Sequence, residues 1–573
     1  MLTALFLCIS FVGCKSIKDI KWKAKDDTVS YVYEYEEEEQ YVDPVIETMS
    51  FSDVTYGDTL TSDSMLPGDF VLEAPTTNMV MTESLSPKFV WLGSVDSTTY
   101  TIVIQKYDEG TSRFADYIRK GGIKTTEYVL EENLEPAEIY RWCIIAQNAY
   151  GETKSTGTID DNYEMFMSKV DVENHIANSG LDFSFDGSIS EKVLCNYLSR
   201  AMTVATENEP LNLEKQNSIL WLRNILFSGA KYISRAACAW VPSKNEEATV
   251  AKQKEFIAYA HSIDSSLIFE ACIFENITEA VNEISIPDYV FDAFGLKHEN
   301  RNFSYAAMVN PEKRCPDITK LEGQMFIYHR ACMYIDAGYE GLHLGQVDVI
   351  GAKEYNVWTN TTKVYNLIRE YAKSNARRHF VLINAHTSYG NASKTYIGAD
   401  GKLLFDFASF PLRATTDETE AHEPSKSNPQ TQYLKVGIMD AIYGKTEGGL
   451  THSGWTCSSL PYYVEFDNAN GITGKLNVPT PNQMINWGRD DISWFASQPE
   501  DYREYWLNYS YNWVKNLGEN GFVCLPGLRV AWPHGSDKMS QYDASFNQFS
   551  TRGNSDIFAI RSIWATDNKK NFF

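Results

Sequence analysis

Apolar residues recur at every second position in the first patterned part of the chain, residues 71–160. Segments rich in turn-forming residues separate these stretches. The clearest examples are Tyr100, Ile102 and Ile104, and then Tyr140, Trp142, Ile144 and Ala146. A period of two is typical of strands with one buried face, and several short strands in succession favour two packed sheets. The sequence therefore predicts an all-β sandwich over residues 71–160.

The pattern changes in the remainder, residues 161–573, where short apolar runs alternate with longer helical stretches from about residue 185. This alternation predicts an α/β fold with a parallel sheet. Eight strand candidates suit a (β/α)8 TIM barrel, and no G-x-G-x-x-G or Walker sequence indicates a nucleotide fold. The predicted strands are 232–240, 267–275, 288–294, 341–350, 379–387, 403–409, 461–467 and 521–528. The predicted helices include 190–206, 246–262, 318–337, 362–376 and 500–517, and the polar stretch 414–432 is expected to be a strand-free rim loop.

The chain begins with a short apolar stretch, residues 1–14, that closes on Phe-Val-Gly-Cys. It is too short to span a bilayer but has the length of an export signal. It resembles the lipobox of bacterial lipoproteins, which implies a lipid-anchored protein of the cell envelope, on its outer surface, with Cys14 lipidated. Residues 15–70 include the acidic run YEYEEEEQ and predict a solvated linker.

The composition limits the classes of molecule that this protein is expected to bind. With 51 basic and 76 acidic residues the net charge is −25, which repels nucleic acid and anionic headgroups, so the lipid anchor is the only membrane contact we expect. The cysteines outside the signal stand singly, without a C-x-x-C pair, and favour buried free thiols over a metal site. A disulfide stays open for an exported chain. We expect no cofactor, no metal and a monomer.

Several residues of the sandwich region follow a recognisable spacing: Trp91, Tyr128-Val-Leu130, Leu134-Glu-Pro136, Tyr140, Asn148 and Gly151. The region 70–158 resembles a fibronectin type III domain. In secreted enzymes this resemblance implies a spacer or a weak carbohydrate-binding module.

The candidate chemistry lies at the ends of two predicted strands. The run LPYYVEFDN ends in Glu465 and Asp467, which share a face of the strand, and GLHLGQVDVIG contains Gln346 and Asp348. The carboxyl ends of barrel strands converge on one mouth, where barrel enzymes hold their catalytic residues. Glycosidic hydrolysis needs two carboxylates, one to protonate the leaving oxygen and one to act as nucleophile or base.

The fourth and seventh strands carry a family resemblance. Many retaining glycosidases of the large (β/α)8 clan place the acid/base at the end of strand four and the nucleophile at the end of strand seven, and this chain is similar in placing Asp348 and Glu465 there. The clan's usual Asn-Glu pair is replaced by Gly345-Gln346-Val347-Asp348. The resemblance implies Asp348 as acid/base and Glu465 as nucleophile or base, with Asp467, Glu275 and Asp406 as further catalytic candidates.

Other polar and aromatic residues near predicted strand ends are candidates for substrate binding, because aromatic faces stack on sugar rings and guanidinium groups bind carboxylates or sulfates. They are Arg235, Trp240, Gln346, His386, Trp455 and Arg413. Two further side chains suit structural roles: Glu270 is expected to form a buried ion pair with an arginine such as Arg235, and His343 to be a satisfied core histidine.

The sequence thus predicts an exported glycoside hydrolase acting on a poly- or oligosaccharide. A non-catalytic surface glycan-binding lipoprotein remains an alternative. A metal-dependent barrel hydrolase is a third, but it needs several converging histidines, and the first predicted strand, YISRAACAW, has none.

Overall fold

The computed structural model describes residues 66–570, except 207–209, 388–394, 412–413, 417–431, 435–445, 468–490, 497, 532–539 and 551–552. The lipidation of Cys14 and most of the acidic linker fall outside the described residues, as does Arg413. Among the described residues, none of the helices combines the length and apolar character needed to cross a bilayer.

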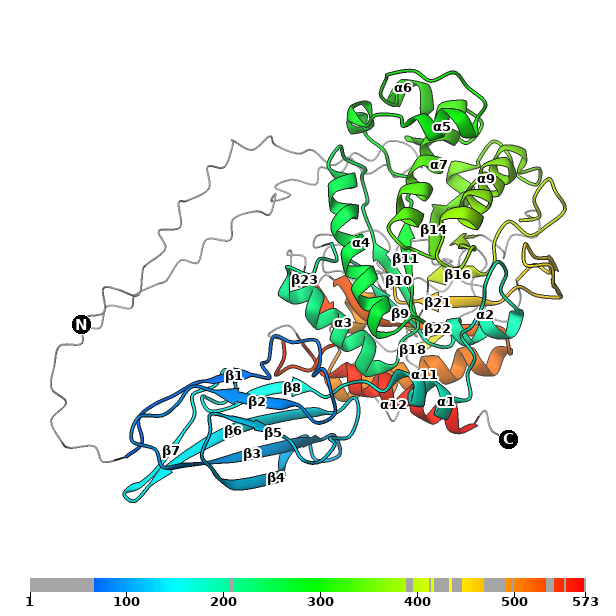
Figure 1. Ribbon diagram of the computed structural model, residues 1–573. Helices are drawn as coiled ribbons and strands as arrows, with labels where there is room; N and C mark the ends of the chain where they lie inside the picture. Colours follow the sequence, from blue (N-terminus) through cyan, green and yellow to red (C-terminus); the bar gives the residue numbers. More distant parts are fainter. Residues whose placement is uncertain are drawn as a thin grey trace, which may run out of the picture.

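Eight parallel strands form a closed barrel, because the last strand pairs with both the first and the seventh. The predicted fold, a sandwich followed by a (β/α)8 barrel, is confirmed (Figure 1). A further strand, β23 (Ser540–Asp543), runs antiparallel to the end of the eighth. The barrel strands are β9 (Ala201–Val204), β10 (Tyr232–Ala237), β11 (Ile268–Cys272), β14 (Gly341–Gln346), β15 (Leu382–His386), β16 (Ala408–Pro411), β21 (Tyr462–Glu465) and β22 (Gly521–Ala531).

One predicted strand and the end of one predicted helix are wrong. The run 288–294 is a helix, α5 (Asp288–Ala293), because its short apolar stretch fits a buried helical turn as well as a strand. Strand β9 lies within the predicted helix 190–206, where α2 (Glu191–Leu198) ends and four fully buried residues follow. The two errors offset each other, so β14 and β21 are still the fourth and seventh strands.

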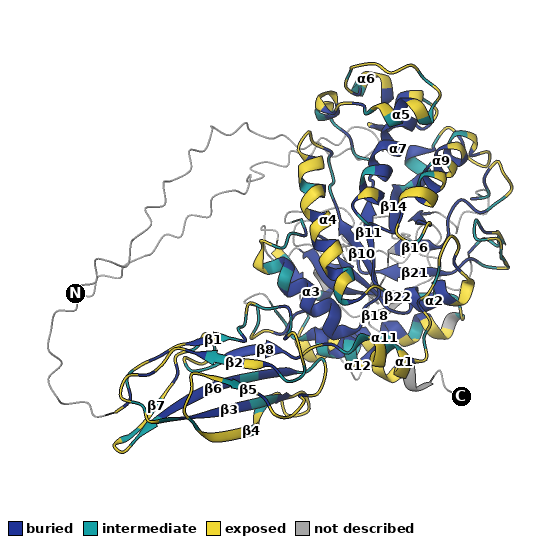
Figure 2. Cartoon of the chain, in the orientation of Figure 1, coloured by how far each residue is buried: buried dark blue, intermediate teal, exposed yellow. Residues whose placement is uncertain are grey.

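Helices surround the barrel and expose their outer faces (Figures 1 and 2). Ser190 illustrates how they begin, since its side chain caps α2 by accepting a hydrogen bond from the Val193 amide. The remaining helices are α1 (Val172–Ser179), α3 (Gln216–Ser228), α4 (Glu246–Ile263), η2 (Glu279–Glu283), α6 (Tyr305–Met308), α7 (Leu321–Asp336), α8 (Val347–Ile350), α9 (Thr359–Asn375), α10 (Asp491–Ala496), α11 (Glu500–Leu517) and α12 (Asp556–Lys570).

Three pairs of short antiparallel strands lie in the connections between barrel strands. The expectation of a strand-free stretch at 414–432 is wrong at its two ends, which pair with each other as β17 and β18. The pairs are β12 (Val309–Asn310) with β13 (Cys315–Pro316), β17 (Ala414–Thr416) with β18 (Gln432–Leu434), and β19 (Gly449–Leu450) with β20 (Thr456–Cys457).

The sandwich packs a three-stranded sheet on a five-stranded one. Between the sheets, Phe89 and Trp142 pack edge to face with ring centroids 4.9 Å apart. One end of the sandwich contacts the barrel. There Tyr107 stacks on Phe558 of α12 at 5.3 Å, and Arg561 pairs with Glu138 at 2.7 Å. The strands are β1 (Leu72–Ala74), β2 (Lys88–Trp91) and β5 (Glu127–Val129), then β3 (Thr99–Asp108), β4 (Arg113–Ile123), β6 (Ile139–Asn148), β7 (Gly151–Lys154) and β8 (Glu164–Met167).

One buried histidine of the helix layer makes stability depend on pH. His329 of α7 lies beside the Tyr289 hydroxyl, 2.8 Å from Nδ1, and burial, reinforced by Arg330, lowers its pKa from 6.5 to about 4. Between pH 6.5 and about 4 the unfolded chain therefore binds a proton that the folded chain does not. The free energy of unfolding should fall with falling pH in this window, with His329 contributing about 1.4 kcal/mol per pH unit. Denaturant titrations across the window should show a shallower slope for His329→Gln, and equal slopes would contradict the assignment.

Candidate active site

Arg235 adopts a backbone conformation that is rare for a residue with a side chain. Its φ is +59° in the middle of β10, where the pairing register with β11 shifts between Ile233 and Ala237. Such a conformation costs on the order of 1–3 kcal/mol and persists only where surrounding contacts hold it. Here the Arg235 amide donates to Glu270 Oε1 at 3.2 Å, and the side chain is buried at the carboxyl end of the barrel.

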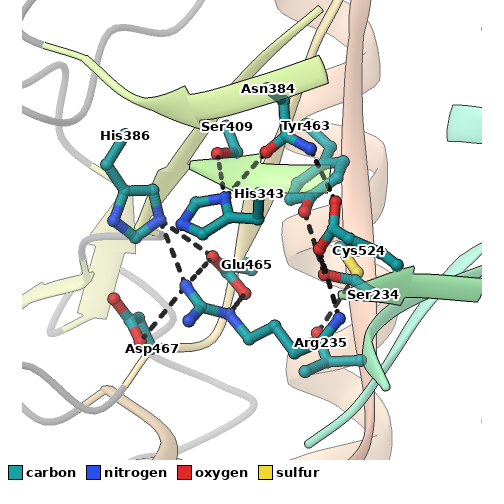
Figure 3. Close-up of polar contacts among 12 residues, drawn as sticks. Ser234, Arg235, His343, Asn384, His386, Ser409, Tyr463, Glu465, Asp467 and Cys524 are labelled. Carbon is teal, nitrogen blue, oxygen red and sulfur yellow. Dashed lines mark hydrogen bonds and ion pairs between the residues drawn. The ribbon is translucent and has the colours of Figure 1, made fainter. Parts of the chain in front are cut away.

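Glu465, the last residue of β21, receives that side chain. Arg235 binds it through two hydrogen bonds, Nε to Oε2 at 2.7 Å and Nη2 to Oε1 at 2.5 Å, and His386 Nε2 lies 2.9 Å from Oε1 (Figure 3). Glu465 is fully buried. Burial alone would raise the pKa of Glu465, but the charge of Arg235, assisted by His386, holds it well below the usual value. Glu465 is therefore ionised across the physiological pH range.

Asp467 extends the ion pair. Its Oδ1 accepts from Arg529 Nη2 at 2.6 Å and lies 3.9 Å from Arg235 Nη2. The pKa of Asp467 is lowered because Arg235 and Arg529 outweigh the effect of burial. Two guanidinium groups thus face two carboxylates, and this balance makes the burial of all four charges tolerable.

Three of these side chains also have the composition of a metal site. Ligand atoms of His386, Glu465 and Asp467 lie within 4.8 Å of one another. The fold thus brings His386 to two carboxylates about 80 positions further along the chain. Arg235, however, contacts both carboxylates directly. A divalent cation would meet this fixed positive charge, so the arrangement suits the guanidinium group better than a metal ion.

On the opposite wall, Glu275 follows β11 and Gln346 ends β14. Glu275 Oε2 accepts from the Gln346 amide at 3.1 Å, and Oε1 accepts from Gln346 Nε2 at 2.9 Å. Gly345 makes this approach possible, since its φ is +49° and a Cβ there would lie 2.5 Å from Glu275 Oε2. Both carboxylate oxygens of Glu275 are engaged in shaping the end of the fourth strand.

Asp348 lies in the single-turn helix α8, directly after the fourth strand, and is half-buried. Its Oδ2 accepts from the Tyr396 hydroxyl at 2.9 Å, and the Tyr396 ring stacks on Trp358 at 5.7 Å. The Tyr396 hydroxyl is thus one group that orients this carboxylate.

An aromatic pair flanks the same mouth. Trp240 and Phe274, just beyond the ends of β10 and β11, stack in parallel with centroids 4.3 Å apart and planes 9° apart. Trp240 is half-buried, and the guanidinium of Arg235 lies 5.9 Å from the Phe274 ring centre.

Two predicted site residues lie away from this group. Trp455 precedes β21, so it packs at the amino end of the barrel, where its Nε1 donates to the Ile189 carbonyl at 2.9 Å. Asp406 precedes β16 and forms a buried ion pair with Arg369 of α9 at 2.8 Å. Neither reaches the carboxyl ends of the strands, so the expected placement of Trp455 and Asp406 at the mouth, as a substrate contact and a catalytic group, is wrong.

Glu270 was predicted to pair with an arginine such as Arg235, but the Arg235 side chain binds Glu465 instead, and only the Arg235 amide reaches Glu270. Glu270 is held by Tyr232, Ser234 and Asn384. Arg529 was not predicted as a site residue, although its position in the final strand, GFVCLPGLRV, placed it near the carboxyl end. The inward turn of Arg235 depends on its positive φ, which no sequence pattern indicates.

No protein-family model matches the sequence, and no curated protein matches it either. Among solved structures, the FN5 domain of Drosophila Lar is 16% identical, with 18% of this chain and 97% of that domain covered at a TM-score of 0.14. A β-glucuronidase from Ruminococcus gnavus is 9% identical, covering 87% of this chain and 68% of that one at a TM-score of 0.28. The β-glucuronidase of Parabacteroides merdae is 8% identical, with 86% and 53% covered at a TM-score of 0.28. At such scores these likenesses carry no functional argument.

The Arg235–Glu465 pair should be strongly coupled energetically. Arg235→Gln or Glu465→Gln leaves the other charge buried without its partner. Either change should lower the free energy of unfolding by about 3–5 kcal/mol. In the double variant, the loss in the free energy of unfolding should be clearly smaller than the sum of the two single losses, as measured by denaturant unfolding. The exposed pair Lys88–Glu127 is the control, where Lys88→Gln should cost less than about 1 kcal/mol. Additive losses for the buried pair would contradict the coupling.

Proposed function

We propose that this protein is an exported glycoside hydrolase that cleaves a poly- or oligosaccharide, with Glu465 as nucleophile or base and Asp348 as proton donor. The observation that supports it most is Glu465 itself, a fully buried carboxylate at the end of the seventh strand that Arg235 and His386 keep ionised. An ionised carboxylate is what a glycosidase needs on one side of the scissile bond.

Glu465 would act on the anomeric carbon, directly or through a water molecule. Positive charge develops on the sugar ring in the oxocarbenium-like transition state, and the fixed negative charge of Glu465 stabilises it there more than in the ground state. Asp467, which Arg529 binds, lies 3.9 Å from Arg235 and would help to keep its guanidinium, and so the Glu465 carboxylate, in one orientation during the reaction.

Asp348 is the better donor of the two carboxylates on the opposite wall. Both oxygens of Glu275 accept N–H groups from Gln346, an arrangement that favours a positioning role. Asp348 has the Tyr396 hydroxyl on Oδ2 and follows the fourth strand, facing the seventh across the barrel. The stacked pair of Trp240 and Phe274 offers an aromatic surface for a sugar ring beside this wall.

Export and anchoring belong to the same proposal. The apolar residues 1–14 ending in Cys14 and the acidic linker support a lipid-anchored protein of the bacterial cell envelope, with the sandwich as a spacer between the linker and the barrel. The contacts of Tyr107 and Arg561 would then hold the barrel in a fixed orientation on that spacer.

One observation favours a second function, glycan capture without turnover. Both oxygens of Glu465 are engaged by Arg235, and the carboxylate is fully buried. A carboxylate held so firmly is also compatible with a purely structural role, in which case the mouth would bind glycans without cleaving them.

Purified protein should be screened against plant, algal and host glycans. For a glycan that is cleaved, Glu465→Gln and Asp348→Asn should each lower kcat/KM by about 10²- to 10⁴-fold, since each removes a group that acts on the transition state. Glu275→Gln should have a smaller effect, and a chelator should have none.

Glu340→Gln is the matched control, because Glu340 is a buried carboxylate paired with Arg377 just before β14, at the amino end of the barrel. It should lose stability but keep kcat/KM for the folded fraction. Full activity in both catalytic variants would overturn the assignment, and tight binding without turnover across the panel would favour the capture function.

A further inference from the structure

A chain of buried hydrogen bonds lies beneath the Arg235–Glu465 pair. It runs from Glu270 of β11 through Asn384 of β15 to His343 of β14, three neighbouring strands of the barrel. Figure 3 shows its last link, where Asn384 and His343 meet beside Glu465. All three side chains are almost completely buried, so the direction of each hydrogen bond matters energetically.

Glu270 determines that direction. Each of its carboxylate oxygens accepts two hydrogen bonds: Oε2 from Tyr232 Oη and Asn384 Nδ2, both at 2.6 Å, and Oε1 from Ser234 Oγ at 2.9 Å and the Arg235 amide at 3.2 Å. Four donors match the acceptor sites of an ionised carboxylate. Burial raises the pKa of Glu270, and the donors from Tyr232, Asn384 and Ser234 oppose that effect.

The orientation of the Asn384 amide follows. If the amide were reversed, its oxygen would face the Glu270 carboxylate at 2.6 Å, and two acceptors would repel each other. The nitrogen of Asn384 therefore faces Glu270, and Oδ1 faces His343 Nδ1 at 2.8 Å. His343 must then carry its proton on Nδ1, which leaves Nε2 as an acceptor.

His343 Nε2 is buried and has no hydrogen-bond partner among the described residues. The His343 ring lies 4.8 Å from the His386 ring and 6.2 Å from Phe274, beside the group that holds Glu465. Burial, and then the nearby charges of His386 and Arg235, keep the pKa of His343 well below its usual value, so the ring stays neutral. A buried acceptor without a donor costs free energy, which a bound hydroxyl group would recover.

We propose that His343 Nε2 accepts a hydrogen bond from one hydroxyl group of the glycan bound against Glu465, and so helps to select the sugar. This inference rests on the proposed glycosidase function. Glu270 and Asn384 are positioning residues, because they fix the tautomer of His343 and do not themselves contact the sugar.

Two substitutions at one position separate the roles of the two ring nitrogens. His343→Asn keeps an amide donor near Nδ1, which preserves the contact with Asn384, but removes the acceptor at Nε2. His343→Gln reaches the Nε2 position with its own amide oxygen. Thermal unfolding should confirm that both variants fold.

For a cleaved glycoside, kcat/KM should fall by about 10- to 100-fold in His343→Asn and less in His343→Gln. The monodeoxy derivative that lacks the recognised hydroxyl should be cleaved equally well by wild type and His343→Asn, while other deoxy derivatives should keep the difference. Equal losses on every derivative, or no loss in His343→Asn, would overturn the inference while Glu465→Gln still supported the proposed function.

Nitrogen NMR of the free protein tests the tautomer without turnover. In wild type, the His343 Nε2 signal should be that of an unprotonated nitrogen. In Glu465→Gln, glycan binding should change the same signal. A proton on Nε2, or a bound glycan that leaves its signal unchanged, would overturn the inference. Absence of both glycan turnover and glycan binding would overturn the proposed function as well.

Discussion

The buried pair of Arg235 and Glu465 is the interaction on which the rest of the site depends. A fully buried carboxylate would take up a proton if it stood alone, because burial disfavours its charged form. The guanidinium of Arg235 reverses that preference and holds the pKa of Glu465 well below its usual value. The backbone of Arg235 accepts a positive φ inside a strand to place the side chain there, a cost that the surrounding hydrogen bonds offset.

The interior of the barrel changes character along its length. At the amino end, apolar side chains fill it, including Phe407 and Leu382, and Trp455 packs against that layer. Above it lies a polar layer in which Asn384 links Glu270 to His343 by hydrogen bonds, and above that the charged group around Glu465. Glu465 therefore lies above a layer of side chains whose hydrogen bonds have a fixed direction.

The two walls of the mouth differ in the kind of group that holds their carboxylates. Guanidinium groups surround Glu465 and Asp467 and keep them charged. Across the barrel, a tyrosine hydroxyl orients Asp348, and an amide engages Glu275. In the proposed function, Glu465 would act as nucleophile or base and Asp348 as proton donor.

The sequence by itself determined the order of the two folds, the position of Glu465 and Asp467 on one face of the seventh strand, and that of Asp348 after the fourth, because hydrophobic periods of two and of about 3.6 are local properties of the chain. Periodicity did not separate β9 from the helix before it or α5 from a strand, since short apolar runs fit both. Only the tertiary structure decided that the Arg235 side chain binds Glu465 and not Glu270, and that Trp455 and Asp406 lie far from the mouth. It also decided that His343 Nε2 has no hydrogen-bond partner in the described part of the chain. These contacts join residues as far as 266 positions apart, and they follow from a kinked backbone and strand pairings that no local pattern specifies.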